Sequence, residues 1–284
     1  MRTAYNTLPD LMLEPLVKTA LAEDFGLSGD VTSRSVVPHE THWKARIVAR
    51  EAGVVSGMQI AALTFRMVDA EMQIRPVLHD GDACGPGDLL MEIEGRAHSL
   101  LLAERVALNF AGRMAGIATM TSAFVAETAG TEARIACTRK TTPGLRVIEK
   151  LAVIHGGGHP HRYSLADAIL IKDNHIAAAG GVSQVLTAAH AVASHMLRIE
   201  IEVDTLEQLE EVIAAGGADV VLLDNMDTRT IRRAVEMVDS RMLTEASGNM
   251  RVERVAEVAR TGVDYISVGA LTHSARTLDI GLDF

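Results

Sequence analysis

Short apolar runs alternate with amphipathic segments throughout the half of the chain that follows Gly130. Six of these runs are rich in β-branched residues and short enough to be buried strands, whereas the segments between them carry apolar residues at helical spacing. The predicted strands are residues 134–138, 168–171, 198–203, 219–223, 241–245 and 264–268, and the predicted helices include 143–154, 182–195, 205–215, 227–238 and 250–261. Because strands that alternate with helices form parallel sheets, this half is expected to be an α/β fold, either open or closed into a barrel.

The half before Gly130 is patterned less regularly. Its predicted elements are a helix at 10–24, two strands joined by a turn within 43–60, a helix at 62–68, a strand at 71–78 and a long helical stretch at 97–128. Gly112 and Gly116 weaken the middle of that stretch, so two helices are an alternative to one.

Composition narrows the class of protein. The chain has 284 residues, of which 48% are hydrophobic and 23% charged, as in ordinary soluble globular proteins. It has no apolar run of the roughly 20 residues needed to span a membrane, and its start lacks the pattern of a signal peptide. Two cysteines, Cys84 and Cys137, form neither a disulfide framework nor a metal-ligand spacing, so a reduced, cytoplasmic protein is expected. A net charge of −10 and only 3% aromatic residues argue against binding to nucleic acid or to anionic membranes.

The segment from Arg134 to Lys172 is basic within this acidic chain. It holds seven lysines and arginines against two acids, Glu149 and Asp167. Clustered like charges repel one another, so the segment is either a solvated basic surface or the binding site of an anion. Position favours the anion site, because Arg139-Lys140 and Lys172 directly follow apolar runs and therefore stand where buried strands end.

Polar residues follow or interrupt all six predicted strands. They are, in chain order, Thr138-Arg139-Lys140, Lys172-Asp173-Asn174-His175, Glu200 with Glu202 and Asp204, Asp224-Asn225, Glu245 to Asn249, and Ser267 to Ala270. Polar groups gathered at strand C-termini are the active-site layout of α/β barrels, whereas an open sheet would spread them along a crevice. We therefore expect a small barrel of about six parallel strands.

Two of these strand ends have the composition of a phosphate-binding loop. Ser247-Gly248-Asn249 and Gly269-Ala270 consist of small residues that let backbone N–H groups approach an anion, and each precedes a predicted helical start. Glu202 and Asp224 could hold Mg²⁺ beside such a phosphate, since hard divalent ions prefer carboxylate oxygens. The alternative is that these acids form structural ion pairs with the lysines and arginines of the basic segment.

Three histidines, His155, His159 and His161, lie in the run HGGGHPH. Apart from His155 and His159, their spacing fits no helix-borne pair of zinc ligands, and the glycines and proline exclude a regular helix. A polar loop in which His161-Arg162 donate to an anion is the preferred interpretation. The chain has no Walker A loop and no GxGxxG, GxSxG or HExxH motif.

A series of short motifs extends along nearly the whole chain. They are Glu23-Asp24, Gly29 to Ser33, Glu104-Arg105 with Asn109, Thr138 to Gly144, Gly157-Gly158 with His161-Arg162, Lys172 to His175, Glu202 to Asp204, Leu223 to Asn225, Ser247-Gly248, and Gly269 to His273. As a set and in this order, they resemble the motifs of the quinolinate phosphoribosyltransferase family, the type II phosphoribosyltransferases.

The resemblance implies a fold, a reaction and an assembly. The fold would be an N-terminal α/β sandwich domain at 1–115, joined by the tail 275–284, and an α/β barrel domain at 116–274. The reaction would transfer phosphoribosyl from phosphoribosyl pyrophosphate to the ring nitrogen of quinolinate with decarboxylation, giving nicotinate mononucleotide, CO₂ and pyrophosphate for NAD biosynthesis. Mg²⁺ would accompany phosphoribosyl pyrophosphate. The assembly would be a homodimer, open to further association, in which Arg105 reaches the neighbouring subunit's site.

The resemblance also implies roles for individual residues. The carboxylates of quinolinate would be bound by Arg105, Arg139, His161, Arg162 and Lys172, with Thr138 among the substrate-binding residues and Lys140 near both substrates. Ribose hydroxyls and Mg²⁺ would be bound by Glu202 and Asp224. The 5′-phosphate would be bound by Ser247-Gly248-Asn249 and Val268-Gly269-Ala270. The expected catalytic residues are Lys140, Lys172, Glu202 and Asp224.

Three alternatives stay open from the sequence. A pyrophosphorylase-like protein associated with molybdenum transport genes shares the scaffold of this family. A non-enzymatic barrel could bind a phosphosugar without turning it over. Lys140 or Lys172 could instead form the Schiff base of an aldolase.

Overall fold

The computed structural model describes residues 6–284 and separates into two compact units. The first unit takes the chain up to Ser122 together with Thr141–Gly157 and Leu271–Phe284, and the second takes Ala123–Lys140 and Gly158–Ala270. The domain boundaries expected from the sequence stay a prediction. Among the described residues, no helix combines the length and the apolar character required to cross a membrane.

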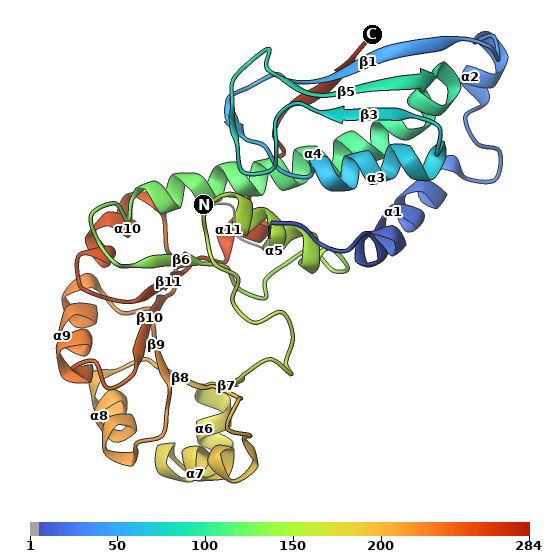
Figure 1. The fold of residues 1–284 in the computed structure, drawn as a ribbon. Coiled ribbons are helices and arrows are strands. Elements are labelled where there is room, and N and C mark those ends of the chain that lie inside the picture. Colours follow the sequence, from blue (N-terminus) through green and yellow to red (C-terminus); the bar gives the residue numbers. More distant parts are fainter. Residues whose placement is uncertain (1–5) are drawn as a thin grey trace. The chain divides into compact units, whose positions relative to one another are not determined.

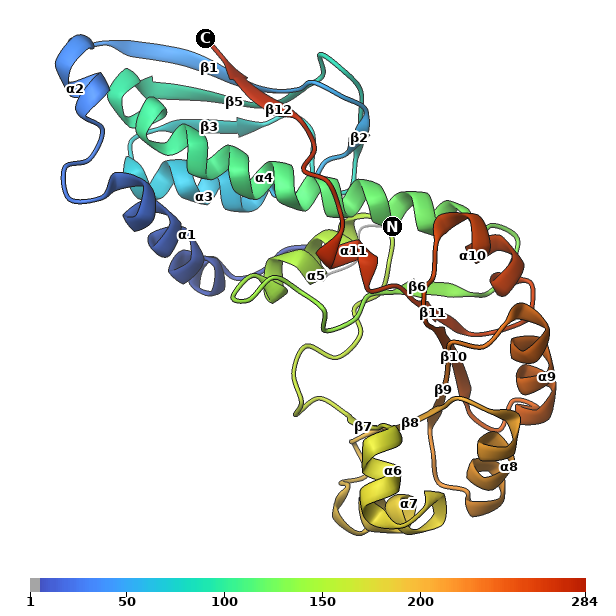
Figure 2. The same ribbon diagram turned by 180° about the vertical axis from the view of Figure 1, so that it is seen from behind.

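The first unit is built on an antiparallel sheet with helices against one face (Figures 1 and 2). Its elements are α1 (Asp10–Phe25), α2 (Val31–Val36), β1 (His42–Ala49), β2 (Gly53–Val54), α3 (Met58–Val68), β3 (Gln73–Pro76), β4 (Ala83–Cys84), β5 (Leu89–Arg96), α4 (Ala97–Ala126), α5 (Arg146–His155) and β12 (Ile280–Asp283). The strand order is β12-β1-β5-β3, so the C-terminal strand belongs to this sheet. Ile47 and Leu90 of the strands pack in one core with Phe65 of α3 and Leu100 of α4.

The stretch that could have formed two helices is the single helix α4, so the two-helix alternative is wrong. Its glycines are required for close packing rather than for a break. A Cβ on Gly116 would lie 1.8 Å from the carbonyl oxygen of Arg276, and a Cβ on Gly112 would lie 3.0 Å from that of Leu278. The backbone N–H of Leu278 donates to the Gly112 carbonyl at 3.0 Å. The C-terminal segment therefore lies directly on the glycine face of α4.

The expected strand pair within 43–60 is only partly present. The first strand forms as β1, but the second is limited to Gly53–Val54, and α3 already begins at Met58. The side chain of Asp80 accepts a hydrogen bond from the Met58 backbone N–H at 2.9 Å, which satisfies one of the free donors at the start of α3. This long-range contact is invisible to local patterning.

The second unit is built on a six-stranded parallel sheet of order β6-β11-β10-β9-β8-β7. Its elements are β6 (Arg134–Ala136), β7 (Ile169–Ile171), α6 (Asp173–Ala179), α7 (Val182–Val192), β8 (Ile199–Val203), α8 (Leu206–Ala215), β9 (Val220–Asp224), α9 (Thr228–Val238), β10 (Leu243–Ser247), α10 (Val252–Ala259) and β11 (Tyr265–Ser267), with α11 (Ala270–His273) at its C-terminal limit. All six predicted strands are confirmed, and so are the five helices predicted between them. The predicted fold class, an antiparallel-sheet unit followed by an α/β barrel sheet, is also confirmed.

The barrel sheet is not closed by a strand pair between its two edges. β6 and β7 are the edge strands, and beside β6 lies the segment around His159, which forms an isolated parallel bridge with Ala136. Hydrogen bonds from the His159 N–H to Ile135 and from the Cys137 N–H to His159 hold this segment in place. The basic segment identified in the sequence therefore borders the open side of the sheet.

Strand register decides which side chains share the inner face. Glu202 of β8 is paired with Leu222 of β9, which is paired with Glu245 of β10, and Asp224 is paired with Ser247. Registered partners in a sheet point to the same side. The intervening residues, such as Ile201, are buried on the other side. The polar residues of three neighbouring strands consequently line one face.

Candidate active site

Glu202 and Lys172 form an ion pair at the ends of β8 and β7. Glu202 is held on the inner face by the alternation of β8, and only 12% of its side chain is exposed, against 46% for Lys172. Lys172 is fixed at the start of α6, where its backbone N–H donates to Nδ1 of His175 at 2.9 Å. The structure thus brings together two predicted catalytic residues of opposite charge.

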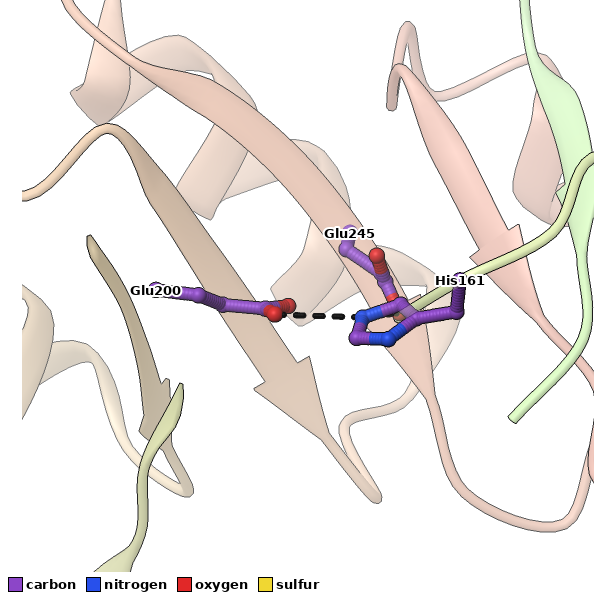
Figure 3. A group of neighbouring side chains, drawn as sticks. All are labelled: His161, Glu200 and Glu245. Carbon is purple, nitrogen blue, oxygen red and sulfur yellow. Dashed lines mark hydrogen bonds and ion pairs between the residues drawn. The ribbon is translucent and has the colours of Figure 1, made fainter. Parts of the chain in front are cut away.

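His161 lies between two buried acids, Glu200 and Glu245 (Figure 3). Its Nε2 is 3.1 Å from Oε2 of Glu200 and 3.7 Å from Oε1 of Glu245. β9 separates β8 from β10, and Glu200 is registered through Val220 with Leu243, so the two acids lie two strand spacings apart and are also offset by two residues along the strands. One oxygen of each acid and a ring nitrogen of His161 nevertheless lie within 4.8 Å of one another. The sheet therefore curves enough to converge side chains on its inner face, as a barrel requires.

Burial dominates the electrostatics of this cluster. Burial, followed by the charge of Glu200, raises the pKa of Glu245 to about 7, against the smaller lowering effects of His161 and a hydrogen bond from Ser267. Sequence reasoning expected His161 to donate to an anionic substrate but gave no role to Glu245. The available signal was an acid in the middle of the apolar strand β10, which a core position tolerates only with a partner or a proton.

The turn after β10 is shaped by close backbone contact with the turn after β9. Gly248 has φ +93°, and a Cβ on it would lie 2.2 Å from Oδ1 and 2.7 Å from the backbone N of Asn225. Asn225, itself at φ +55°, donates its N–H to the carbonyl of Ser247 at 3.1 Å. Asp224 accepts from the Asn225 side chain at 2.7 Å. Only glycine fits this position, which gives the predicted cradle Ser247-Gly248-Asn249 a defined backbone.

The second glycine turn follows the neighbouring strand β11. Val268 is buried, and its N–H donates to the carbonyl of Ala136 on β6 at 2.9 Å. Gly269 and Ala270 follow it and are half-buried. Because β10 and β11 are adjacent parallel strands, the two glycine turns lie at the same edge of the sheet.

The basic residues differ in how firmly they are held. Arg162 donates to the carbonyl of Ala168 at 3.2 Å, and burial, followed by the charge of Arg139, lowers its pKa. An arginine stays charged nonetheless. The opposing influence of Glu200 on the same pKa places Arg139, Arg162 and Glu200 within electrostatic reach of one another. Lys140 is exposed, and its N–H donates to Oγ1 of Thr138 at 3.1 Å.

Arg105 lies in the first unit, on α4. Its side chain is 63% exposed, and its Nη2 is 3.9 Å from Glu104. It therefore belongs to a different unit from the predicted substrate-binding residues of the barrel sheet.

The other histidines of HGGGHPH have partners unrelated to a metal site. His155 is buried, and its two ring nitrogens lie 2.7 Å from Oγ of Ser56 and 3.0 Å from the carbonyl of Asn6. His159 packs edge-on against Tyr265. The interpretation of this run as a polar loop fits these contacts, with His161 alone directed to the inner face of the sheet.

Comparison with known proteins gives matches over nearly the whole chain. The family described as "Quinolinate phosphoribosyl transferase, C-terminal domain" matches residues 117–283, and the corresponding N-terminal domain matches residues 30–115. A "Probable nicotinate-nucleotide pyrophosphorylase [carboxylating]" of Bacillus subtilis is 44% identical over 275 residues, covering 96% of this chain and 93% of the relative. The crystal structure of NadC from Streptococcus pyogenes superposes with a TM-score of 0.94 at 40% identity and covers 98% of both chains. The nicotinate-nucleotide pyrophosphorylase structure from Francisella tularensis also has a TM-score of 0.94, at 35% identity, over 100% of this chain and 99% of that one.

Proposed function

The chain belongs to the quinolinate phosphoribosyltransferase family, and from that premise we propose which of its residues perform the reaction. The reaction transfers phosphoribosyl from phosphoribosyl pyrophosphate to the ring nitrogen of quinolinate and releases pyrophosphate and CO₂, leaving nicotinate mononucleotide for NAD biosynthesis. The observation that carries the assignment of residues is the inner edge of the barrel sheet, where basic side chains, buried acids and two glycine turns lie together.

The basic residues suit the diacid. Quinolinate carries two carboxylates, and the forked guanidinium groups of Arg139 and Arg162 can each bind a carboxylate through two hydrogen bonds. His161 and Lys172 add donors on the same side, with Thr138 at the end of β6. Glu200 and Glu202 offset part of this positive charge in the resting protein, which keeps the lysines and arginines close together without a ligand.

The two glycine turns suit the 5′-phosphate. Backbone N–H groups of Ser247-Gly248-Asn249 and of Val268-Gly269-Ala270 are the donors that we assign to it. No side chain fits at Gly248 because Asn225 occupies the space beside it, so the fold itself fixes the backbone of this turn.

Glu202 and Asp224 suit the ribose hydroxyls and Mg²⁺. Both offer carboxylate oxygens from the inner face of adjacent strands, and oxygen ligands shared with substrate phosphates are the usual environment of Mg²⁺. When bound, Mg²⁺ would offset the charge of the pyrophosphate leaving group. Asp224 keeps its orientation through Asn225, and Glu202 through Lys172.

The proposed chemistry needs no covalent enzyme intermediate. As the bond to pyrophosphate breaks, positive charge develops at the anomeric carbon, and the carboxylates of Glu202 and Asp224 stabilise it. The ring nitrogen of quinolinate then bonds to that carbon and becomes cationic. The adjacent carboxylate departs as CO₂, its electron pair stays on the ring carbon next to the cationic nitrogen, and that carbon takes a proton from water. Lys140, which we place near both substrates, supplies a fixed positive charge to the departing pyrophosphate.

The other candidate functions have less support. Lys172 is ion-paired with Glu202, and a protonated amine is not the nucleophile that an aldolase Schiff base requires. Borohydride reduction in the presence of a carbonyl substrate should therefore leave no covalent adduct. The Bacillus subtilis and Francisella tularensis relatives carry the name of a nicotinate-nucleotide pyrophosphorylase, not of a molybdenum transport protein or a phosphosugar-binding protein.

We further propose that the protein works as a cytoplasmic homodimer in which Arg105 completes the site of the partner subunit. The support is the exposure of Arg105 on α4, in a different unit from the other residues to which the family resemblance assigns substrate binding. Arginine on a rigid helix is well suited to bind a carboxylate across an interface.

The reaction is tested by its products. Purified protein incubated with quinolinate, phosphoribosyl pyrophosphate and Mg²⁺ should form nicotinate mononucleotide, pyrophosphate and CO₂ in equal amounts. Labelled carbon in the carboxylate next to the ring nitrogen should appear only in the CO₂. Nucleotide formed without loss of that carbon, or no nucleotide at all, would contradict the proposed function.

A further inference from the structure

The cluster of His161, Glu200 and Glu245 contains more acceptors than donors. A protonated His161 has one hydrogen on Nε2, and of the two acids Glu200, at 3.1 Å, is within hydrogen-bond distance of that nitrogen, whereas Glu245 is 3.7 Å away. Among the described residues, Oε1 of Glu200 and Oε1 of Glu245 are buried without any hydrogen bond. Two ionised carboxylates would therefore present two unsatisfied acceptors to each other inside the barrel.

One added proton resolves this arrangement. A neutral carboxyl group donates one hydrogen bond and an ionised one only accepts, so a proton on Glu245 converts the two facing acceptors into a donor and an acceptor. One oxygen of each acid lies within 4.8 Å of the other, so the two carboxyl groups face each other across a short gap that a side-chain rotation can close (Figure 3). It also removes the repulsion between two negative charges that are both more than nine-tenths buried.

We propose that Glu245 acts in its neutral, protonated form as a positioning residue that donates to Glu200, so that Glu200 remains the single counter-ion of a protonated His161. This inference rests on the proposed role of His161 in binding a carboxylate of quinolinate. With one ionised acid rather than two, the cluster of His161, Glu200 and Glu245 carries no net charge instead of a net negative charge, and the Glu200 hydrogen bond fixes the plane of the His161 ring. Glu245 itself does not contact the substrate.

The neighbours of Glu245 agree with a neutral acid. Its registered partners are the apolar Leu222 on β9 and Tyr265 on β11, and the other titratable and polar groups that face it are Glu200 on β8, His161 on the loop after α5, and Ser267 on β11. Burial and Glu200 both raise its pKa, to about 7. Ionisation of Glu245 above that pH places a second negative charge beside His161 and opposes an incoming carboxylate.

Glutamine distinguishes the two forms of Glu245, because it resembles the neutral acid and cannot ionise. For Glu245→Gln we expect the KM for quinolinate to stay within about threefold of wild type at about pH 7 and the kcat to change little. The wild-type KM should rise between about pH 7 and about pH 9, and this rise should disappear in the variant. Glu200→Gln, which removes the counter-ion, should raise the KM for quinolinate about 10-fold or more at every pH. Glu210→Gln on the exposed side of α8 is the matched control and should behave as wild type.

A second measurement does not depend on activity. Difference infrared spectra of wild type and Glu245→Gln near neutral pH should show a protonated carboxyl band that only wild type has. A protein without product formation but with this band would contradict the proposed function and leave the proton assignment standing. A missing band, or a loss of quinolinate affinity in Glu245→Gln as large as in Glu200→Gln, would overturn the inference. So would a stoichiometric divalent metal that both substitutions release, because the three side chains would then be ligands.

Discussion

Gly248→Ala tests whether phosphate binding by the turn after β10 depends on the close contact between the backbones of Gly248 and Asn225. Two costs can be separated. Alanine at φ +93° is strained by about 1 kcal/mol after the gain from a less flexible unfolded chain. Its Cβ would also lie 2.7 Å from the backbone N of Asn225, which cannot rotate away as a side chain can. Overpacking of this kind costs about 1–3 kcal/mol, so the expected total is about 2–4 kcal/mol.

Gly262→Ala is the matched control for this variant. Gly262 lies in the same unit at φ +89°, but a Cβ there would meet only Val235, at an ordinary 3.5 Å. It should lose about 1 kcal/mol in urea unfolding and keep the wild-type KM for phosphoribosyl pyrophosphate. Gly248→Ala should lose more stability and raise that KM by about 10-fold or more, since the displaced turn no longer presents its N–H groups to the phosphate. Equal stability losses in the two variants, with an unchanged KM in both, would refute the argument.

The remaining predictions concern the buried acid, the shared site and the metal. The pKa of Glu245 is raised from 4.5 to about 7 in the folded protein, so the loss of folding stability caused by its ionisation grows as the pH rises from about 4.5 to about 7 and is complete above that. Glu245→Gln should therefore be up to about 3 kcal/mol more stable than wild type in urea at about pH 8, and as stable as wild type below about pH 4.5. A stability difference that is constant across pH would show that the acid is not buried in this way. Arg105→Ala and Lys140→Ala should each be inactive. A mixture of the two that has exchanged subunits should regain partial activity, because a mixed dimer then holds one intact shared site. No recovery after confirmed subunit exchange would contradict the shared-site proposal. Chelation of divalent ions should abolish product formation and added Mg²⁺ restore it, with quinolinate binding by calorimetry largely retained; full activity in the chelator would exclude the assigned role of Mg²⁺.

The sequence predicts the second unit well because its strands are uniform apolar runs. Two of the helices between these runs, α8 and α9, also begin at side-chain caps, Thr205 and Asp227, so local and tertiary preferences agree there. Helix α6 was not predicted, since it is a single short helix without a buried residue and leaves no apolar periodicity.

Features that depend on distant contacts were harder to predict. The continuity of α4 depends on the C-terminal segment packing on Gly112 and Gly116, which lie more than a hundred residues earlier. The pairing of His161 with Glu200 and Glu245 depends on register and on sheet curvature, so the sequence could place these residues at strand ends without showing that they meet. The phosphate-binding role of the turn at Gly248 stays a prediction, and the need for glycine there comes from the contact with Asn225, which the sequence does not show.

Discrimination between quinolinate and nicotinate tests the central claim most directly. If the basic residues at the strand ends bind a pyridine diacid, nicotinate lacks one of the carboxylates that they hold and also the group that leaves as CO₂. We expect kcat/KM for quinolinate to exceed that for nicotinate by at least about 100-fold with the same phosphoribosyl donor. Equal kcat/KM values for the two acids would contradict the account of this site.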